Sequence, residues 1–155
     1  EFYLILKNEL EKVFVYLAQA IVRDGEGATK FVSIDVKNCE NSHEALRIAY
    51  TVAHSPLVKT ALFASDANWG RILAAVGRSG VKNIVLEDIQ IFLDDVCIVE
   101  NGARAASYTE NAGADVMAKQ ELSIVIDMGR GSACETVWTT DLSHEYVTIN
   151  AEYRT

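Results

Sequence analysis

Arg23-Asp24-Gly25-Glu26-Gly27-Ala28-Thr29-Lys30 joins two segments that have different hydrophobic periods. Residues 9–22, before it, place apolar side chains at helical spacing, and residues 31–36, after it, alternate as a half-buried strand does. The glycines on either side of Glu26 allow backbone conformations that a bulkier residue would not reach. The stretch therefore predicts a helix-to-strand junction that can push a carboxylate into a cleft.

Caps and breakers predict the helices that follow. Asn41, with Glu44 three residues later, resembles a capping box at the start of a helix, and Pro56, the only proline, should interrupt or restart that helix. Asp66 is a candidate cap for a further helix that ends before Gly80. A short helix is also expected over residues 112–119.

Alternating segments predict the strands. A strand pair is expected at Ile89–Leu93 and Val96–Val99, around an acidic turn, and another strand at 122–128. Gly129-Arg130-Gly131 then favours a tight hairpin turn over an anion-binding nest, with a return strand at 133–139. Hairpins with helices between them indicate an α+β fold, with a mixed or antiparallel sheet and helices packed on it, rather than a doubly wound parallel sheet.

Composition narrows the classes of function. The 155 residues are 50% hydrophobic, enough for one domain or a little more, and the formal net charge is −8. An acidic surface disfavours nucleic acid and anionic membranes, and no apolar run reaches transmembrane length. The first eight residues lack the basic region and cleavage site of a signal peptide. Three scattered cysteines fit a reducing cytoplasm better than a disulfide framework.

Other constellations are weaker. The glycine-rich stretch lacks the order and spacing of a P-loop, so an ordinary solvated turn is the alternative to a site. The three histidines have no metal-ligand spacing, and we expect no metal. Ser143, His144 and Asp141 are the residue types of a catalytic triad, but nothing places Ser143 on a nucleophile elbow, so we do not expect a triad. Ile149 and Tyr153 can anchor the C-terminus, which would then present Asn150, the Thr155 hydroxyl and the terminal carboxylate to a small zwitterion; a terminal strand docked on the core is equally compatible.

Six segments in one order resemble the ornithine acetyltransferase family of arginine biosynthesis, also called glutamate N-acetyltransferase. The likeness runs from about Arg23 to Thr155 and matches the C-terminal part of that family's β chain. Departures are Ala67, where proline is common, and His54, where asparagine is frequent. The matching segments are Arg23–Lys30, Ser55–Ala61, Asp66–Arg71, Gly129–Gly131, Trp138–Val147 and Ile149–Thr155.

The resemblance implies a larger self-cleaving fold in which the new N-terminal threonine of the β chain is the nucleophile. That threonine takes acetyl from N-acetylornithine and passes it to glutamate, using its own amine as base and an oxyanion hole from the α chain. The substrate-binding positions implied here are Glu26, Asn150 and Thr155. Glu26 would pair with an ammonium of the substrate or of the nucleophile, and the other two would orient the amino-acid head group.

The nucleophile has no counterpart in these residues, so the chain alone is expected to be inactive. The implied partners are the α chain and the remainder of the β chain in a cytoplasmic α2β2 assembly. No cofactor is expected, apart from acetyl-coenzyme A as a second donor if the enzyme is bifunctional. The expected units are the end of the nucleophile domain (1–28), a C-terminal α+β domain (29–136) and a segment returning to the active site (137–155). The rival hypotheses are a non-catalytic folding or interaction module and a related N-terminal-nucleophile amidohydrolase.

Overall fold

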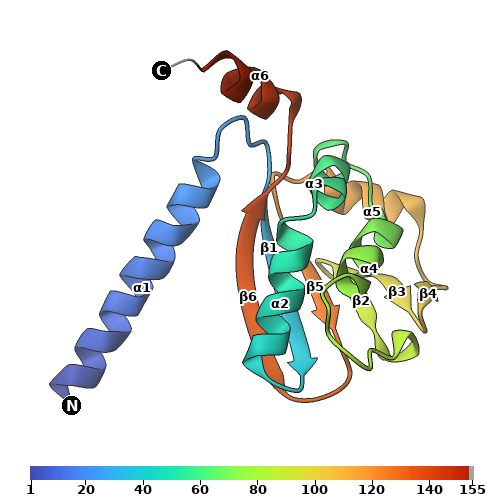
Figure 1. The fold of residues 1–155 in the computed structure, drawn as a ribbon, viewed down its shortest axis with the longest axis horizontal. Coiled ribbons are helices and arrows are strands. Elements are labelled where there is room, and N and C mark those ends of the chain that lie inside the picture. Colours follow the sequence, from blue (N-terminus) through green and yellow to red (C-terminus); the bar gives the residue numbers. More distant parts are fainter. Residues whose placement is uncertain (154–155) are drawn as a thin grey trace.

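A computed structural model describes residues 1–153 and shows a six-stranded mixed sheet with helices packed against it (Figure 1). The N-terminal helix extends away from this body, and the C-terminal helix lies beside the junction that follows it. The elements are α1 (Phe2–Arg23), β1 (Phe31–Cys39), α2 (Ser42–Ala53), α3 (Pro56–Phe63), α4 (Trp69–Gly77), the 3-10 helix η1 (Leu86–Asp88), β2 (Gln90–Leu93), β3 (Val96–Glu100), β4 (Ala103–Arg104), α5 (Glu110–Met117), β5 (Glu121–Asp127), β6 (Ala133–Thr140) and α6 (His144–Glu152).

The strand order β4-β3-β2-β5-β1-β6 confirms the α+β prediction. Only β1 and β5 pair in parallel; the other neighbours in this sheet are antiparallel. Ile34 of β1 lies opposite Ile124 on one side and Val137 on the other. Val32, Ile34 and Val36 are fully buried, as their alternation predicts, and α2 packs over β1 and β6.

The predicted hairpin at Gly129-Arg130-Gly131 is wrong. β1 lies between β5 and β6, so the segment passes around the end of β1 instead of reversing directly. The Arg130 N–H donates to the Asn38 carbonyl at 2.8 Å. A Cβ on Gly131 would lie 2.1 Å from the Cys39 carbonyl oxygen, so only glycine fits this close crossing.

Two helix boundaries also differ from expectation. The N-cap of α4 is Asn68, whose side chain accepts from the Arg71 N–H at 3.1 Å, rather than Asp66. The C-terminal segment forms α6 instead of a docked strand, and Tyr153 is 76% exposed, so it anchors nothing in this structure. By contrast, the predicted Asn41 cap of α2 and the restart at Pro56 are both confirmed.

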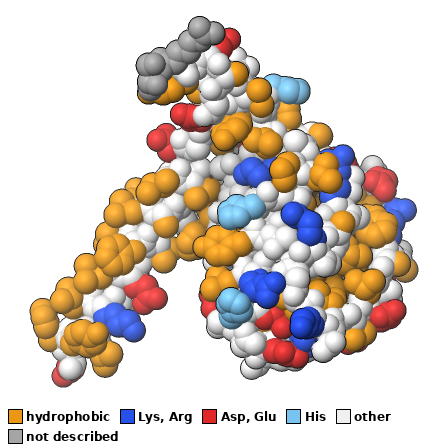
Figure 2. Space-filling model, in the orientation of Figure 1, with side chains coloured by type: hydrophobic (Ala, Val, Ile, Leu, Met, Phe, Trp, Pro, Cys, Tyr) orange, Lys and Arg blue, Asp and Glu red, His pale blue; other side chains and the backbone are white. Residues whose placement is uncertain are grey.

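Helix α1 is longer than its predicted range and leaves its apolar side chains in solvent. Within the described residues none of its 22 positions is buried. Phe2, Phe14 and Ile21 are exposed by 76%, 64% and 74% respectively, and hydrophobic side chains run along the helix (Figure 2). None of the helices in residues 1–153 is both long and apolar enough to cross a bilayer.

Candidate functional site

The junction after α1 is tied to the sheet by the last residue of that helix. The Arg23 guanidinium lies 3.7 Å above the Phe31 ring centroid and pairs with the Glu121 carboxylate at 3.0 Å. Phe31 and Glu121 begin β1 and β5 and lie opposite each other in the sheet. The end of α1 is thereby fixed over the start of two neighbouring strands.

Gly27 lies at the centre of the junction and makes its closest contact with the start of α6. Its φ of +67° lies in the left-handed region, and a Cβ there would come within 2.7 Å of the Tyr146 nitrogen and 2.9 Å of the Ser143 Oγ. Ser143 donates from its hydroxyl to the Gly27 carbonyl at 2.6 Å and accepts from the Tyr146 N–H at 3.3 Å. The second glycine of the sequence motif is therefore required for both its conformation and the close packing.

Asp141 holds the other end of the junction. Its Oδ1 accepts from the backbone N–H groups of Thr29 and Lys30 at 2.8 and 2.9 Å, and its Oδ2 accepts from the Thr29 hydroxyl at 2.6 Å. The residue is 3% exposed. Because a buried carboxylate is costly unless its oxygens are satisfied, these three bonds fix the entry to β1.

Lys59 of α3 also contacts the residues on either side of Asp141. Its ammonium donates to the Thr140 carbonyl and to the Thr139 hydroxyl, the latter at 3.1 Å, and its own carbonyl accepts from the Leu142 N–H at 3.1 Å. Burial lowers the pKa of Lys59, and the negative charge of Asp141 acts in the opposite direction. The lysine thus brackets Asp141 with contacts on both sides of it.

Two of the predicted substrate-binding residues meet at this junction. The Asn150 Nδ2 donates to the Glu26 Oε2 at 2.9 Å and to the Tyr146 carbonyl at 2.9 Å. Both side chains belong to exposed residues, although 124 positions separate them in the chain. Thr155, the third predicted residue, lies outside the described residues. The sequence did not predict the structural roles of Asp141 and Ser143 at this site, because both were considered only as members of a possible catalytic triad with His144.

The triad does not form. Ser143 directs its hydroxyl to Gly27, the Asp141 carboxylate accepts from Thr29 and Lys30, and the His144 ring stands edge-on to Phe63 with 5.4 Å between centroids. The signal for the actual roles was nevertheless present: serine directly before a helix is a preferred N-cap. The structure therefore assigns both residues to the architecture of the junction.

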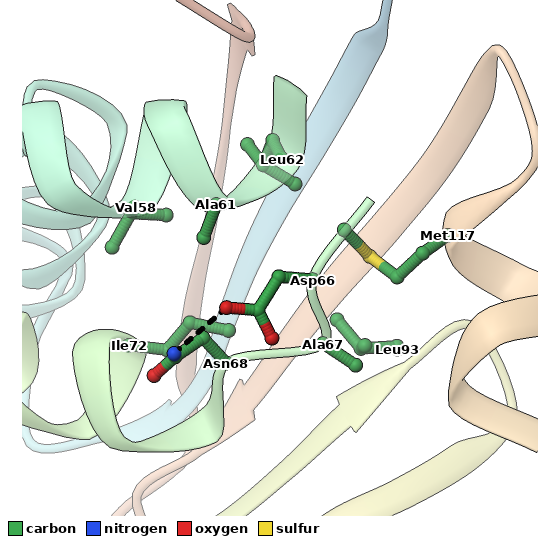
Figure 3. A pocket seen from close by; sticks show the side chains of 9 residues that line it. All are labelled: Val58, Ala61, Leu62, Asp66, Ala67, Asn68, Ile72, Leu93 and Met117. Carbon is green, nitrogen blue, oxygen red and sulfur yellow. Dashed lines mark hydrogen bonds between the residues drawn. The ribbon is translucent and has the colours of Figure 1, made fainter. Parts of the chain in front are cut away.

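The Asp66–Arg71 segment forms the corner between α3 and α4. The Asn68 amide donates to the Asp66 carboxylate at 2.9 Å (Figure 3), and Arg71 donates to the Leu57 carbonyl at 2.9 Å. A cavity of about 10 Å³ beside it is lined mainly by aliphatic side chains, including Val58, Leu62 and Ile72. A space of one water's size takes no amino-acid substrate, so this segment shapes the fold.

Arg130 belongs to an ion-pair cluster and not to an anion nest. It pairs with Glu40 at 2.6 Å and with Glu44 at 3.2 Å, and it donates to the carbonyls of Lys82 and Asn83. Burial, and secondarily the Glu44 charge, raises the pKa of the nearby Cys39 thiol to about 12, so that thiol is not a nucleophile at neutral pH. Residues 1–153 contain no group of three or more His, Cys, Asp or Glu side chains arranged to hold a metal ion.

Comparison with known proteins places these features in a family. The family model described as "ArgJ family" matches residues 2–155. The chain belongs to the ArgJ family. A solved ArgJ structure, the "Arginine biosynthesis bifunctional protein argJ" of Bacillus halodurans, superimposes with a TM-score of 0.90 at 34% identity. That alignment covers 97% of this chain and 70% of the other, so the α+β architecture is an ArgJ architecture.

Curated ArgJ relatives match nearly the whole chain. The "Arginine biosynthesis bifunctional protein ArgJ" of Pseudomonas fluorescens is 61% identical over 100% of this chain and 38% of that protein. The protein of the same name from Neisseria meningitidis is 54% identical over 98% of this chain and 37% of its own length. The chain therefore spans less than two fifths of the length of these ArgJ relatives.

Proposed function

We propose that this chain is part of a longer enzyme that transfers acetyl from N2-acetylornithine to glutamate, and that it supplies Glu26 and Asn150 to the amino-acid binding site. The observation that carries the proposal is the 2.9 Å hydrogen bond between these two exposed side chains, held at the end of a rigid junction. Membership of the ArgJ family supports the reaction class. Thr155 completes the set as a proposed hydroxyl that orients the head group.

In the proposed reaction, a threonine Oγ outside this chain attacks the acetyl carbonyl of N2-acetylornithine while the threonine's own amine takes the hydroxyl proton. Oxyanion donors from the α chain stabilise the tetrahedral intermediate. The C–N bond then breaks, ornithine leaves with the proton, and the acetyl group remains as a threonine ester. The glutamate amine attacks that ester and regenerates the threonine hydroxyl.

Glu26 suits an ammonium-binding role on electrostatic grounds. A carboxylate has about four lone-pair sites, so the one bond from Asn150 leaves capacity for an ammonium donor. The Asn150 amide donates to Glu26 and to the Tyr146 carbonyl, which fixes its orientation and leaves its own oxygen for a substrate donor. The pair can therefore recognise an ammonium of the substrate by charge and by direction.

The proposal includes two partners, the α chain and the remainder of the β chain. The apolar side chains exposed along α1 support a companion formed by the α chain and the rest of the β chain, because a large exposed apolar surface marks a protein–protein interaction site. We propose autocatalytic cleavage, an α2β2 assembly and a cytoplasmic location on the family resemblance. The word "bifunctional" in the relatives' names supports acetyl-coenzyme A as a second acetyl donor.

The test uses the complete enzyme with Glu26→Ala, and Glu87→Ala as its control. Glu87 is an exposed carboxylate of η1. We expect Glu26→Ala to lower kcat/KM for acetyl transfer at least about tenfold, the equivalent of about 1.4 kcal/mol, and Glu87→Ala to leave it unchanged. Equal kinetics for both variants would show that Glu26 is only a loop residue, and acetyl transfer by the purified 155-residue chain would contradict an external nucleophile.

A further inference from the structure

We propose that Ser143 is a positioning residue for substrate binding, because one hydroxyl joins the loop that carries Glu26 to the helix that carries Asn150. The inference rests on the proposed function of those two side chains and adds a residue that touches neither of them nor the substrate. Ser143 is 6% exposed and stands at the N-cap of α6.

The hydroxyl makes two contacts that serve different segments. The hydroxyl donates a hydrogen bond to the carbonyl of Gly27 at 2.6 Å, one residue after Glu26. Its lone pair accepts from the Tyr146 N–H at 3.3 Å, in the first turn of α6. Because Tyr146 also accepts from Asn150 through its carbonyl at 2.9 Å, the same helical turn locates Asn150. One oxygen therefore relates the positions of both substrate-facing side chains.

Gly27 and Ser143 are closely packed, and the segment that carries Ser143 is itself held in place. A Cβ on Gly27 would lie 2.9 Å from the Ser143 Oγ, too close for a real side chain, so only glycine leaves room for the cap. Two residues earlier, Asp141 is anchored by its three hydrogen bonds to Thr29 and Lys30, the residues directly before β1. Asp141 thus holds the segment that carries Ser143 in place, and the Ser143 hydroxyl bonds the Glu26 loop to that segment.

Loss of the hydroxyl should therefore weaken substrate binding without disturbing the chemistry of acetyl transfer. The Gly27 carbonyl loses its donor and the first turn of α6 loses its cap. The positions of Glu26 and Asn150 relative to each other are then no longer fixed by a common contact. We expect KM for the amino-acid substrate to rise about fivefold, the effect of one ordinary hydrogen bond, with kcat nearly unchanged. A cap that merely stabilised α6 would lower thermal stability and leave KM alone.

The experiment compares Ser143→Ala with Thr109→Ala in the complete enzyme. Thr109 is the N-cap of α5 and accepts from the Ala112 N–H at 3.3 Å, so its removal costs a comparable cap at another place. We expect similar falls in Tm and a KM increase only for Ser143→Ala, with Ser143→Thr restoring the wild-type KM. If Ser143→Ala does not fold, Ser143→Gly keeps a residue tolerated at an N-cap and removes the same hydroxyl. Equal KM values for the cap variants would overturn the inference.

A double variant separates this inference from the proposed function. In a Glu26→Ala background, Ser143→Ala should lower kcat/KM by a smaller factor than it does in the wild type, because residues that act through one another are not additive; full additivity would contradict the inference. If Glu26→Ala itself has no effect, the proposed function fails, and positioning is then judged by trypsin cleavage after Arg23. Faster cleavage in Ser143→Ala than in Thr109→Ala supports the positioning of the Glu26 loop by Ser143, and equal cleavage overturns it.

Discussion

Helices α1 and α2 obtain their stability from different places. α2 has 12 residues, a side-chain cap from Asn41 and six buried positions against the sheet. α1 has 22 residues, no side-chain hydrogen bond at its Glu1 N-cap and, in the part of the chain that the structure describes, no buried position. Since most helical stability in proteins comes from packing, α2 is stabilised by this chain, whereas α1 receives little such stabilisation from the residues that the structure describes.

The junction between the two regions is where Glu26 and Asn150 meet. At the end of the junction next to β1, Asp141 accepts from the N–H groups of Thr29 and Lys30. The other end of the junction continues into α1. A site at such a boundary can be completed by whatever covers α1. This position agrees with the proposal that this chain supplies binding residues and that the nucleophile lies outside it.

The largest expected effect comes from the core beneath α2. Ile48 is fully buried, so Ile48→Ala should lower the free energy of unfolding by about 2–5 kcal/mol in urea titrations of this chain. Leu10 of α1 is 44% exposed, and Leu10→Ala should change it by less than about 0.5 kcal/mol. Similar losses for both variants would break the contrast between the helices.

Asp141 tests how firmly the sheet holds the junction. Asp141→Ala leaves the N–H groups of Thr29 and Lys30 without their acceptor, and we expect a loss of about 3 kcal/mol in unfolding free energy. Asp141→Asn keeps an oxygen for both N–H groups and should lose clearly less. Equal stability of Asp141→Ala and the wild type would show that the junction is held by other contacts.

Gly27 at the junction and Gly77 in α4 form a matched pair for glycine substitutions. Gly27→Ala forces a side chain into a left-handed φ and against Tyr146, so it should destabilise the chain by more than about 1 kcal/mol. Gly77 is the last residue of α4 and a Cβ there meets nothing within 4 Å, so Gly77→Ala should stabilise by up to about 1 kcal/mol. Thermal unfolding of the two variants gives the comparison, and opposite signs are required.

The smallest effect is expected at the surface of α1. Lys12 pairs with Glu9 at 2.7 Å, but their side chains are 71% and 61% exposed. Lys12→Ala should therefore change the unfolding free energy by less than about 0.5 kcal/mol. A larger change, measured in the same urea titrations, would mean that α1 is coupled to the body more strongly than its contacts indicate.

Local signals predicted the elements well and their partners poorly. The alternation of Val32, Ile34 and Val36 and the cap at Asn41 depend on neighbouring residues, and both are confirmed. The insertion of β1 between β5 and β6 depends on pairing across about ninety residues, which the turn at Gly129-Arg130-Gly131 could not reveal. Asp66 and Asn68 are both acceptable caps, and tertiary contacts of Arg71 with α3 accompany the choice of Asn68.

The candidate site divides in the same way. Family resemblance indicated Glu26 and Asn150, and the structure brings them together. The residues that hold them were not predicted, because the bond from Ser143 to Gly27 spans 116 positions and those from Asp141 to Lys30 and Thr29 span 111 and 112. Sequence spacing carries no information on contacts of that range.

The most direct test of the account is amide hydrogen exchange, measured in the isolated chain and in the complete enzyme. We expect amides of α1 (Phe2–Arg23) to exchange rapidly in the isolated chain and to be protected in the complete enzyme, while amides of β1 (Phe31–Cys39) are protected in both. Equal protection of α1 in the two samples would contradict the claim that this helix, and with it the site at its end, is completed by protein outside these residues.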